Sequence, residues 1–405
     1  MVVTLVAYLL ATTPPESLSF EESLARAART SGPASASRAA ETLRSVEARL
    51  SPLTSSPQLT LETGLRRGPP GTGPDLRLGL GQAFNLSGHA GGRAASLRAE
   101  TAALSAEPRA LLLSRQLAIA EAWLLLWAAE QSAEQAAHEV TLAETFRAAV
   151  EASASLGAAT RLETAEASAY LAEAKLAAID TDGLVAGRWM ALARLIGHTP
   201  SRSLHANGPL PQVELPPAER LTALLSRAAE LPEPVTQTLS AQAERTRAEE
   251  LRAARGLQLH VGLSALREYD GAWGGLTTLT LSPPLFDRGE RERGPLLANA
   301  ERLEGAAQEA TSQATTLLAE TLHELEHSRE VLETLEQQLL PATEETARLK
   351  AVLFKAGDAT VPEVILARRA LAAANIRLCQ ARAEAAWARV KTRLLIDALP
   401  GGSHP

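Results

Sequence analysis

Two stretches of the chain alternate apolar and polar residues with a period of two, which is the pattern of β-strands with one apolar face. The first stretch, at about 57–86, contains two such runs separated by a Gly/Pro-rich turn at 66–75. The second, at about 256–283, contains two more, separated by Asp270-Gly271, a dipeptide typical of hairpin turns. The pattern therefore predicts two β-hairpins.

Runs rich in alanine and leucine predict helices over most of the remaining sequence. The first run extends from Phe20 to about Leu50, a second from Arg93 to Val150, and a third from Gly289 to about Leu340. A helix of some fifty residues is roughly 75 Å long, whereas most globular helices have about 8–20 residues. Small alanine side chains let such helices pack closely side by side.

The same order of elements occurs twice. Gly157–Glu163 and Gly357–Glu363 share the pattern G-x-A-T-x-x-E at an offset of 200 residues, and Gln82–Gly88 corresponds to Pro283–Gly289 at an offset near 201. Each copy reads helix, strand, strand, long helix, turn, long helix. Internal repetition of this kind indicates one structural unit written twice.

The repeats define the expected domain organisation. Residues 16–206 form the first repeat, 207–217 a Pro-rich linker, and 218–405 the second repeat. Residues 1–15 are apolar and end at a Pro-Pro pair. They are predicted to be an export signal or a plain N-terminal tail, and they are too short to span a bilayer as a helix.

Composition excludes some classes of protein. The 405 residues have a formal net charge of −7 and only 3% aromatic residues. The sequence has no excess of basic residues, which a nucleic-acid-binding protein usually shows. Cys379 is the only cysteine, so the sequence has no disulfide framework and no thiolate zinc site.

Four strands are too few to close a barrel. Strands of about ten residues, when tilted, can cross a hydrocarbon layer, but open sheet edges do not occur in lipid. Strands from three chains would make a barrel of twelve. Tyr269 and Trp273 flank the second hairpin turn, and Phe84 and Phe286 lie at the opposite strand ends, as aromatic girdles would. The alternative is a soluble hairpin with one face buried.

Both repeated turns contain the same structural residue types. Glycine supplies the positive φ of a helix end, threonine caps the next helix, and glutamate three residues later completes a capping box. These residues are Gly157, Thr160 and Glu163 in the first copy and Gly357, Thr360 and Glu363 in the second. The sequence therefore predicts two tight helical hairpins.

One motif points to different chemistry. His323-Glu324-Leu325-Glu326-His327 matches H-E-x-x-H, the zinc-peptidase signature. Residues at i and i+4 share a helix face, but a catalytic zinc needs a third ligand and a shaped pocket. The helical pattern continues past the motif, and no later histidine completes a longer signature. We interpret the motif as a charged helix face or tunnel lining, with no metal site. One alternative is that His323 and His327 contact transported cations. The other alternative is a zinc peptidase.

The chain resembles the TolC-like outer-membrane efflux proteins from about Leu18 to Gly401. Pro284, Phe286, Asp287 and Gly289 match the family's P-L-F-D-x-G element, and Gln82, Phe84 and Gly88 are similar to its counterpart in the first repeat. Phe354–Ala367 and Ser155–Ala167 resemble the helical hairpin tips. The form of Gln82–Gly92 favours the subgroup that is paired with heavy-metal cation pumps.

The resemblance implies a mainly α fold and a homotrimer. Three chains would form a 12-stranded β-barrel in the outer membrane and a long α-helical barrel that extends into the periplasm. The implied function is a passive exit duct for drugs or metal cations in a tripartite efflux system, without enzyme activity or cofactor. The partners would be outer-membrane lipid, a periplasmic adaptor and an inner-membrane transporter.

The hairpin tips would dock the adaptor and gate the pore. Asp358, which replaces Ala158 of the first copy, would place three carboxylates at the pore mouth and favour cations. Two alternatives to an exit duct remain open: a soluble coiled-coil scaffold with long helices, and the H-E-x-x-H peptidase.

Overall fold

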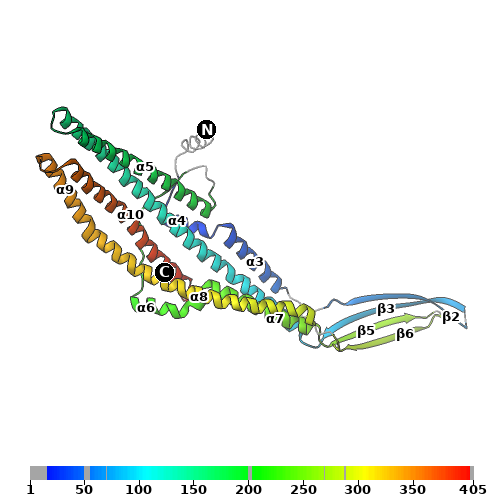
Figure 1. Ribbon diagram of the computed structural model, residues 1–405. Coiled ribbons are helices and arrows are strands. Elements are labelled where there is room, and N and C mark those ends of the chain that lie inside the picture. Colours follow the sequence, from blue (N-terminus) through cyan, green and yellow to red (C-terminus); the bar gives the residue numbers. More distant parts are fainter. Residues whose placement is uncertain are drawn as a thin grey trace. The chain divides into compact units, whose positions relative to one another are not determined.

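The computed structural model describes residues 16–49, 55–69, 71–198, 203–268, 270–286 and 289–401. They form two compact units, and each unit contains segments of both sequence repeats. The helical unit comprises the described parts of Met1–Ala34, Arg109–Leu231 and Gln313–Pro405, and the sheet unit comprises Ser35–Pro108 and Pro232–Ser312. Long helices and a small antiparallel sheet confirm the predicted mainly α fold with β-hairpins (Figure 1).

Helices make up most of the described chain. They are α2 (Phe20–Ala27), α3 (Ser31–Glu47), α4 (His89–Ser155), α5 (Arg161–Ile196), α6 (Ala218–Ala223), the 3₁₀-helix η1 (Leu224–Glu230), α7 (Pro232–Ala254), α8 (Glu290–Thr334), the π-helical turn η2 (Leu335–Leu339), α9 (Leu340–Ala356) and α10 (Val361–Ala398). The strands are β1 (Glu16–Leu18), β2 (Gln58–Gly68), β3 (Gly71–Asn85), β4 (Leu204–Ala206), β5 (Gln258–Arg267) and β6 (Trp273–Ser282).

The helix predicted from Phe20 to Leu50 is two helices in the structure. A capping box starts α2, in which Glu22 N–H donates to Ser19 Oγ at 3.2 Å. α2 ends at Ala27, and α3 begins at Ser31. The break has a local cause, because Pro33 has no N–H and is tolerated only in the first turn of a helix.

A π-helical turn joins α8 to α9 without a break in helical structure. η2 covers Leu335–Leu339, and Pro341 follows it at the start of α9. Proline removes one backbone donor and its ring crowds the carbonyl of the preceding turn. A π-turn is a common accommodation within an otherwise α-helical segment.

The sheet unit contains a four-stranded antiparallel sheet in the order β2-β3-β5-β6. The register pairs Leu61 with Leu78, Leu80 with Leu263, and Val261 with Leu279. Directly opposed residues share one face of a sheet, so most leucines of the four strands lie on the same face, and Leu266 and Leu276 lie on the opposite one. The opposite face is rich in glycine, serine and threonine.

The turn predicted at 66–75 is wrong, because most of those residues belong to strands. Arg66 pairs with Gly73, and Leu65 pairs with Pro74. β2 reaches Gly68 and β3 starts at Gly71. Gly68, Gly71, Gly73 and Pro74 are accommodated within the two strands, and the connection between the strands is short.

Trp123 is the centre of the main core of the helical unit. Its side chain is fully buried, and its Nε1 donates a hydrogen bond to the carbonyl oxygen of Leu18 at 2.9 Å. Its ring meets Phe20 edge to face, with centroids 5.4 Å apart. α4 passes the length and hydropathy test for a membrane span, but Leu124 and Leu126 are buried in this same core. Packing in the core therefore accounts for part of its apolar stretch.

A short parallel pair of strands, β1 and β4, covers this core and was not predicted. The Ala206 N–H donates to the Glu130 carboxylate at 3.1 Å, which holds β4 on α4. Burial raises the pKa of Glu130 to about 7, while the Ala206 N–H acts in the opposite direction. Each strand has only three residues, too few to show a periodic pattern.

Trp123 should therefore dominate the stability of the helical unit. We expect Trp123→Ala to lower the free energy of unfolding by about 3–5 kcal/mol through cavity formation. Trp123→Phe keeps much of the volume and loses the hydrogen bond to Leu18, so about 1–3 kcal/mol is expected. Urea denaturation followed by circular dichroism measures both changes. Equal stability of the alanine variant and the wild type would contradict this assignment of the core.

Candidate functional site

The two repeated G-x-A-T-x-x-E motifs end their helices with the same backbone geometry. Gly157 and Gly357 have φ values of +76° and +85°. In the second hairpin the Asp358 N–H donates to the Leu353 carbonyl at 2.8 Å, and the first hairpin has the equivalent bond at 2.9 Å. This bond satisfies a carbonyl at the helix end, as in a Schellman motif. The α4–α5 and α9–α10 turns therefore have one design (Figure 1).

Each turn is followed by a capping box, as the sequence predicted. Thr160 N–H donates to Glu163 Oε2 at 2.7 Å, and Glu163 N–H donates back to Thr160 Oγ1 at 3.2 Å. In the second turn Thr360 N–H donates to Glu363 Oε2 at 2.9 Å. Lys350 Nζ adds a bond to Glu363 Oε1 at 2.9 Å. Only the second box therefore includes a cation.

A hydrophobic cluster joins the four helices behind these turns. Phe146 of α4 lies at its centre, with ring centroids 6.4 Å from Tyr170 and 5.5 Å from Phe354. The Arg368 Cζ lies 5.3 Å from the centroid of the Phe146 ring. Residues of both hairpins thus share one packed centre within the helical unit.

A half-buried polar network accompanies this cluster and was not predicted. The Tyr170 hydroxyl donates to the Glu139 carboxylate, and Arg368 donates to the Leu142 carbonyl at 3.3 Å. Burial raises the pKa of Glu139, and the positive charges of Arg368 and His138 oppose this shift. Burial likewise lowers the pKa of Arg368, against the effect of Glu139. These side chains connect the two hairpins, but they share no motif or spacing in the sequence.

The two elements that lead from the sheet into the long helices also share a geometry. Gly88 and Gly289 have φ values of +79° and +78°. The Gly92 N–H donates to the Gly88 carbonyl at 2.9 Å, and the Arg293 N–H donates to the Gly289 carbonyl at 2.9 Å. The glycine in each element therefore permits an abrupt change from strand to helix.

Asn85 is the residue of this junction that sequence analysis missed. Its Nδ2 donates to the Ala253 carbonyl at the end of α7 (2.8 Å), and its Oδ1 accepts from the Ser87 N–H before α4 (2.9 Å). Gly256 is required beside it, because a Cβ there would lie 2.0 Å from Ser87 Oγ. Asparagine is a common capping residue. Its position shortly before a glycine turn could therefore have predicted its capping role.

Other predicted junction residues have identifiable positions. Gln82 Nε2 donates to the backbone oxygen and the hydroxyl of Ser55, both at 3.0 Å, and so attaches the segment before β2 to β3. Pro284 is partly buried between β6 and α8. Asp287 lies outside the described residues.

The predicted aromatic residues lie at both ends of the sheet. Phe84 lies on the apolar face near the helices, and Phe286 is 99% exposed just beyond β6. Trp273 is exposed at the turn end, directly opposite Arg267. Tyr269 lies outside the described residues.

The H-E-x-x-H motif lies on an exposed face of α8. The rings of His323 and His327 are stacked with centroids 6.0 Å apart. Glu324, which would serve as the base of a peptidase, forms an ion pair with Lys391 Nζ at 2.8 Å. Within the described part of the chain, no group of three His, Cys, Asp or Glu residues is placed to hold a metal.

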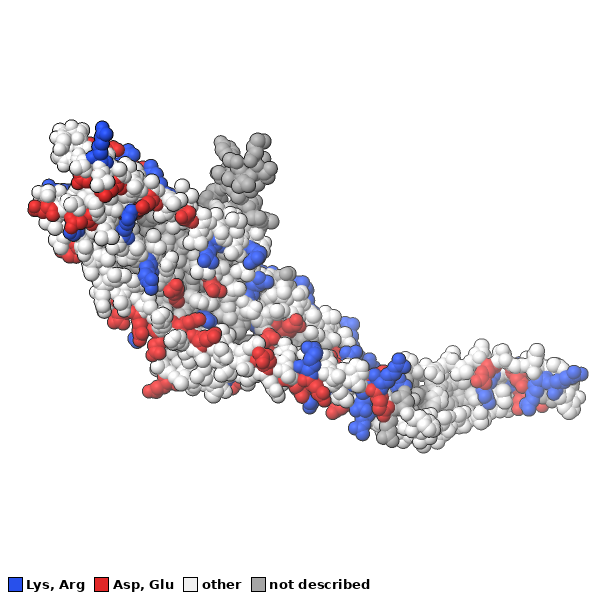
Figure 2. All heavy atoms as spheres, viewed as in Figure 1, with Lys and Arg blue, Asp and Glu red and all other residues white. Residues whose placement is uncertain are grey.

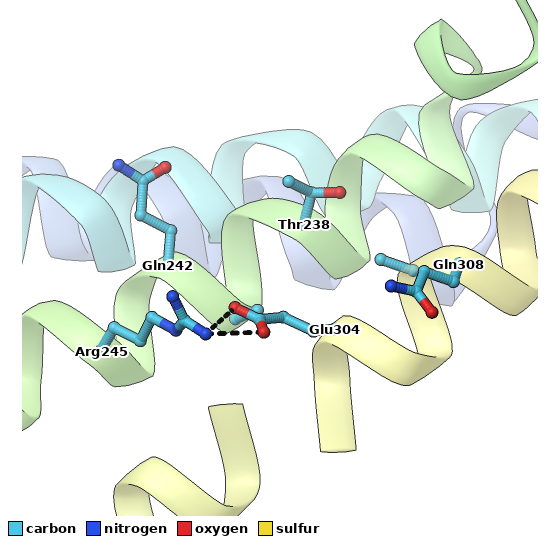
Figure 3. Close-up of a pocket in the computed structure, with 7 residues that line it drawn as sticks. Thr238, Gln242, Arg245, Glu304 and Gln308 are labelled. Atoms are coloured by element: carbon cyan, nitrogen blue, oxygen red, sulfur yellow. Dashed lines mark hydrogen bonds and ion pairs between the residues drawn. The ribbon is translucent and has the colours of Figure 1, made fainter. Parts of the chain in front are cut away.

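The groove in Figure 3 lies between α7 and α8 in the sheet unit. Its labelled lining residues are Thr238, Gln242 and Arg245 on α7, and Glu304 and Gln308 on α8. Arg245 and Glu304 face one another across it and form an ion pair at 2.6 Å. This pair joins the two helices, and the lining residues of the groove include neither a histidine nor a cysteine.

No protein-family model matches the sequence, and no curated protein matches it. Solved structures do match the fold. The outer-membrane channel OprN gives a TM-score of 0.73 at 15% identity, over 93% of this chain and 89% of that chain. The outer membrane protein VceC of Vibrio cholerae gives 0.67 at 18% identity, over 94% and 95%. The open state of the Neisseria gonorrhoeae MtrE outer membrane channel gives 0.69 at 18% identity, over 93% and 88%.

These matches cover nearly the whole of this chain and of each channel. The chain therefore has the fold of the TolC-like outer-membrane channels, which confirms the resemblance that the repeated motifs indicated.

The second capping box should resist acid. The Thr360 N–H, and next the Lys350 ammonium, lower the pKa of Glu363 from 4.5 to about 2. A lowered pKa means that the cap stabilises the fold fully above about pH 4.5 and is lost only as the pH falls through about 2. We expect Glu363→Gln to speed hydrogen exchange in the 357–363 segment at neutral pH, measured by mass spectrometry.

The control is Glu345→Gln, which removes a partner of Arg348 on the same hairpin without touching Thr360. It should leave exchange at the turn unchanged. Identical exchange for wild type and Glu363→Gln would show that the carboxylate does not hold the turn.

Proposed function

We propose that three copies of this chain form an outer-membrane exit duct of a tripartite efflux system, with a helical tunnel that extends into the periplasm. The observation that carries the proposal is the sheet, whose leucine face is open in the single chain. Leu65, for example, is 83% exposed. Such a face is unstable in water and suited to lipid.

The sheet edges support the same proposal. β2 and β6 are the two edge strands of the four-stranded sheet. Edge strands present unpaired N–H and C=O groups, and each such group costs several kcal/mol in hydrocarbon. Pairing between copies removes both edges at once.

The internal repeat specifies that pairing. Within the chain, β3 of the first repeat pairs with β5 of the second, with Leu80 opposite Leu263. In the first hairpin Leu59 pairs with Leu80, and in the second hairpin Leu259 pairs with Leu281. Because Leu259 is the repeat equivalent of Leu59, Leu281 is the repeat equivalent of Leu80. Thr63 is then the equivalent of Leu263. If the same interface recurs between copies, β6 pairs with β2 of the next copy and places Leu281 opposite Thr63.

The hairpin turns are the proposed docking points for a periplasmic adaptor and the gate of the duct. Leu156 is 85% exposed at the first turn, and Leu162 is exposed just beyond it. Exposed leucines beside the predicted tip residues suit contact with a partner helix. An inner-membrane transporter would supply the energy for export of drugs or metal cations, and the aromatic residues would anchor the barrel at both membrane surfaces.

Membrane fractionation distinguishes this duct from the alternatives. A duct pellets with the outer membrane and runs as a heat-labile trimer, whereas a soluble coiled-coil scaffold does neither. Zinc-dependent peptidase activity that is lost in Glu324→Gln would instead support the third class.

Cysteine cross-linking tests the proposed contact between copies. In a Cys379→Ala background, the pair Thr63→Cys and Leu281→Cys should form a disulfide between copies on oxidation, because opposed Cβ atoms lie about 4.5–5.5 Å apart. Gel electrophoresis of heated samples should then show covalent trimers.

The matched control is Thr63→Cys with Thr277→Cys, which shares the same sheet face but is four residues out of register. It should give little cross-linking. Preferential cross-linking of the control pair would overturn the register, and a wild-type chain that stays monomeric in detergent and in membranes would overturn the duct.

Asp358 should affect ion selectivity. Three exposed carboxylates at the duct entrance favour cations, so Asp358→Asn should reduce cation selectivity in single-channel recordings under a salt gradient. Ala158→Asp, which adds three carboxylates at the equivalent positions of the first turn, should increase it. Unchanged reversal potentials in both variants would exclude a selective role for the turns.

A further inference from the structure

Charged residues of the sheet are divided unequally between its two faces. On the apolar face the four strands carry two arginines and no carboxylate: Arg67 on β2 and Arg267 on β5. The opposite face carries both signs, with Glu62, Arg66, Asp75 and Arg77. Arg77 forms an ion pair with Glu62 at 3.3 Å. Only the apolar face therefore has an uncompensated positive charge.

The two arginines occupy equivalent positions of the repeat, separated by 200 residues. Each follows an apolar position of its strand on the same face, Leu65 or Ala265, on the side of the turns. Figure 2 shows that the charged side chains of the sheet gather toward this end. The arginines thus mark the end of the apolar band.

Trp273 gives this end of the face the character of a membrane interface. It lies directly opposite Arg267, whose Cζ is 5.9 Å from the centroid of the Trp273 ring. Tryptophan is enriched where a membrane protein passes from hydrocarbon to head groups. Arg267 is exposed, and a guanidinium over an aromatic ring is attracted to the face of that ring.

We propose that Arg67 and Arg267 bind the phosphate groups of anionic lipids in the leaflet around the turn end of the sheet. The inference rests on the proposed function, because it requires the leucine face to lie in lipid. The planar guanidinium donates two parallel hydrogen bonds to a phosphate. Its aliphatic part lies along the apolar surface while its head reaches the interface.

Three copies of the chain would carry six such arginines, two in each copy. Their repeat-equivalent positions distribute them around the barrel, one on the first strand of every hairpin. An anionic interface attracts each basic residue by about 1 kcal/mol, which corresponds to roughly a fivefold change in affinity per arginine. Loss of both Arg67 and Arg267 should therefore weaken lipid binding by roughly 30-fold.

The test compares four full-length proteins purified as trimers in neutral detergent. They are the wild type, Arg67→Ala with Arg267→Ala, the control Arg66→Ala with Arg77→Ala on the opposite face, and Arg67→Lys with Arg267→Lys. Each is titrated with diphosphorylated lipid A, with the same lipid after dephosphorylation, and with inorganic phosphate, and binding is followed by tryptophan fluorescence and native mass spectrometry.

We expect the wild type and the opposite-face control to prefer the phosphorylated lipid equally. The apolar-face alanine variant should lose that preference, and the lysine variant should recover part of it, because lysine keeps the charge without the paired hydrogen bonds. Inorganic phosphate should not compete. Effective competition by inorganic phosphate would indicate a free-anion site and overturn the assignment to lipid.

Equal preference for the phosphorylated lipid in all four proteins would also overturn the proposal. If all four proteins show this equal preference while their trimers insert and conduct, the result contradicts the lipid site and leaves the proposed exit duct standing. Failure of the wild type to trimerise or insert would instead remove the proposed function. The two failures are therefore distinguishable.

Discussion

The unpaired edges of the four-stranded sheet are the constraint on which the proposed assembly depends. A single chain leaves a row of backbone donors and acceptors on β2 and on β6, beside a face of exposed leucines. The leucines are suited to hydrocarbon, but the unpaired backbone groups cannot remain there. Within the chain, the second strand of one hairpin (β3) already pairs with the first strand of the other (β5). The free edges are again a second strand (β6) and a first strand (β2), so they can pair in the same way. Internal duplication thus provides the template for the proposed contact between copies.

The repeats share backbone geometry more closely than they share electrostatics. Both hairpin turns use glycine, threonine and glutamate in the same way, and both junctions start a helix from a glycine with positive φ. Side chains break this equivalence. Lys350 pairs with Glu363 only in the second turn, and Asn85 caps two helices only in the first junction. A channel built from three copies would contain six units with similar backbone geometry, and it would present two chemically different kinds of turn.

Local patterns predicted what local interactions determine. The four strands, the capped turns and the long helices each follow from residues adjacent in the sequence, and the capping boxes at Thr160 and Thr360 formed as expected. The network of Glu139, Tyr170 and Arg368 could not be predicted, because Arg368 and Leu142 are 226 residues apart and meet only through packing. The three-residue strands β1 and β4 were too short to detect, and a Gly/Pro-rich composition concealed the ends of β2 and β3.

The π-helical turn at Leu335–Leu339 lies within the long helical run that leads to the second hairpin turn. A π-turn accommodates an additional residue without interrupting the helix, and each residue of an α-helix turns the chain by about 100°. A deletion in a regular α-helical part of α9 would therefore rotate every side chain beyond it, through Asp358, whereas a deletion within the π-turn would restore regular α-helix and leave those side chains on their faces. The π-turn is thus a place where this long helix can gain or lose one residue while the architecture stays the same.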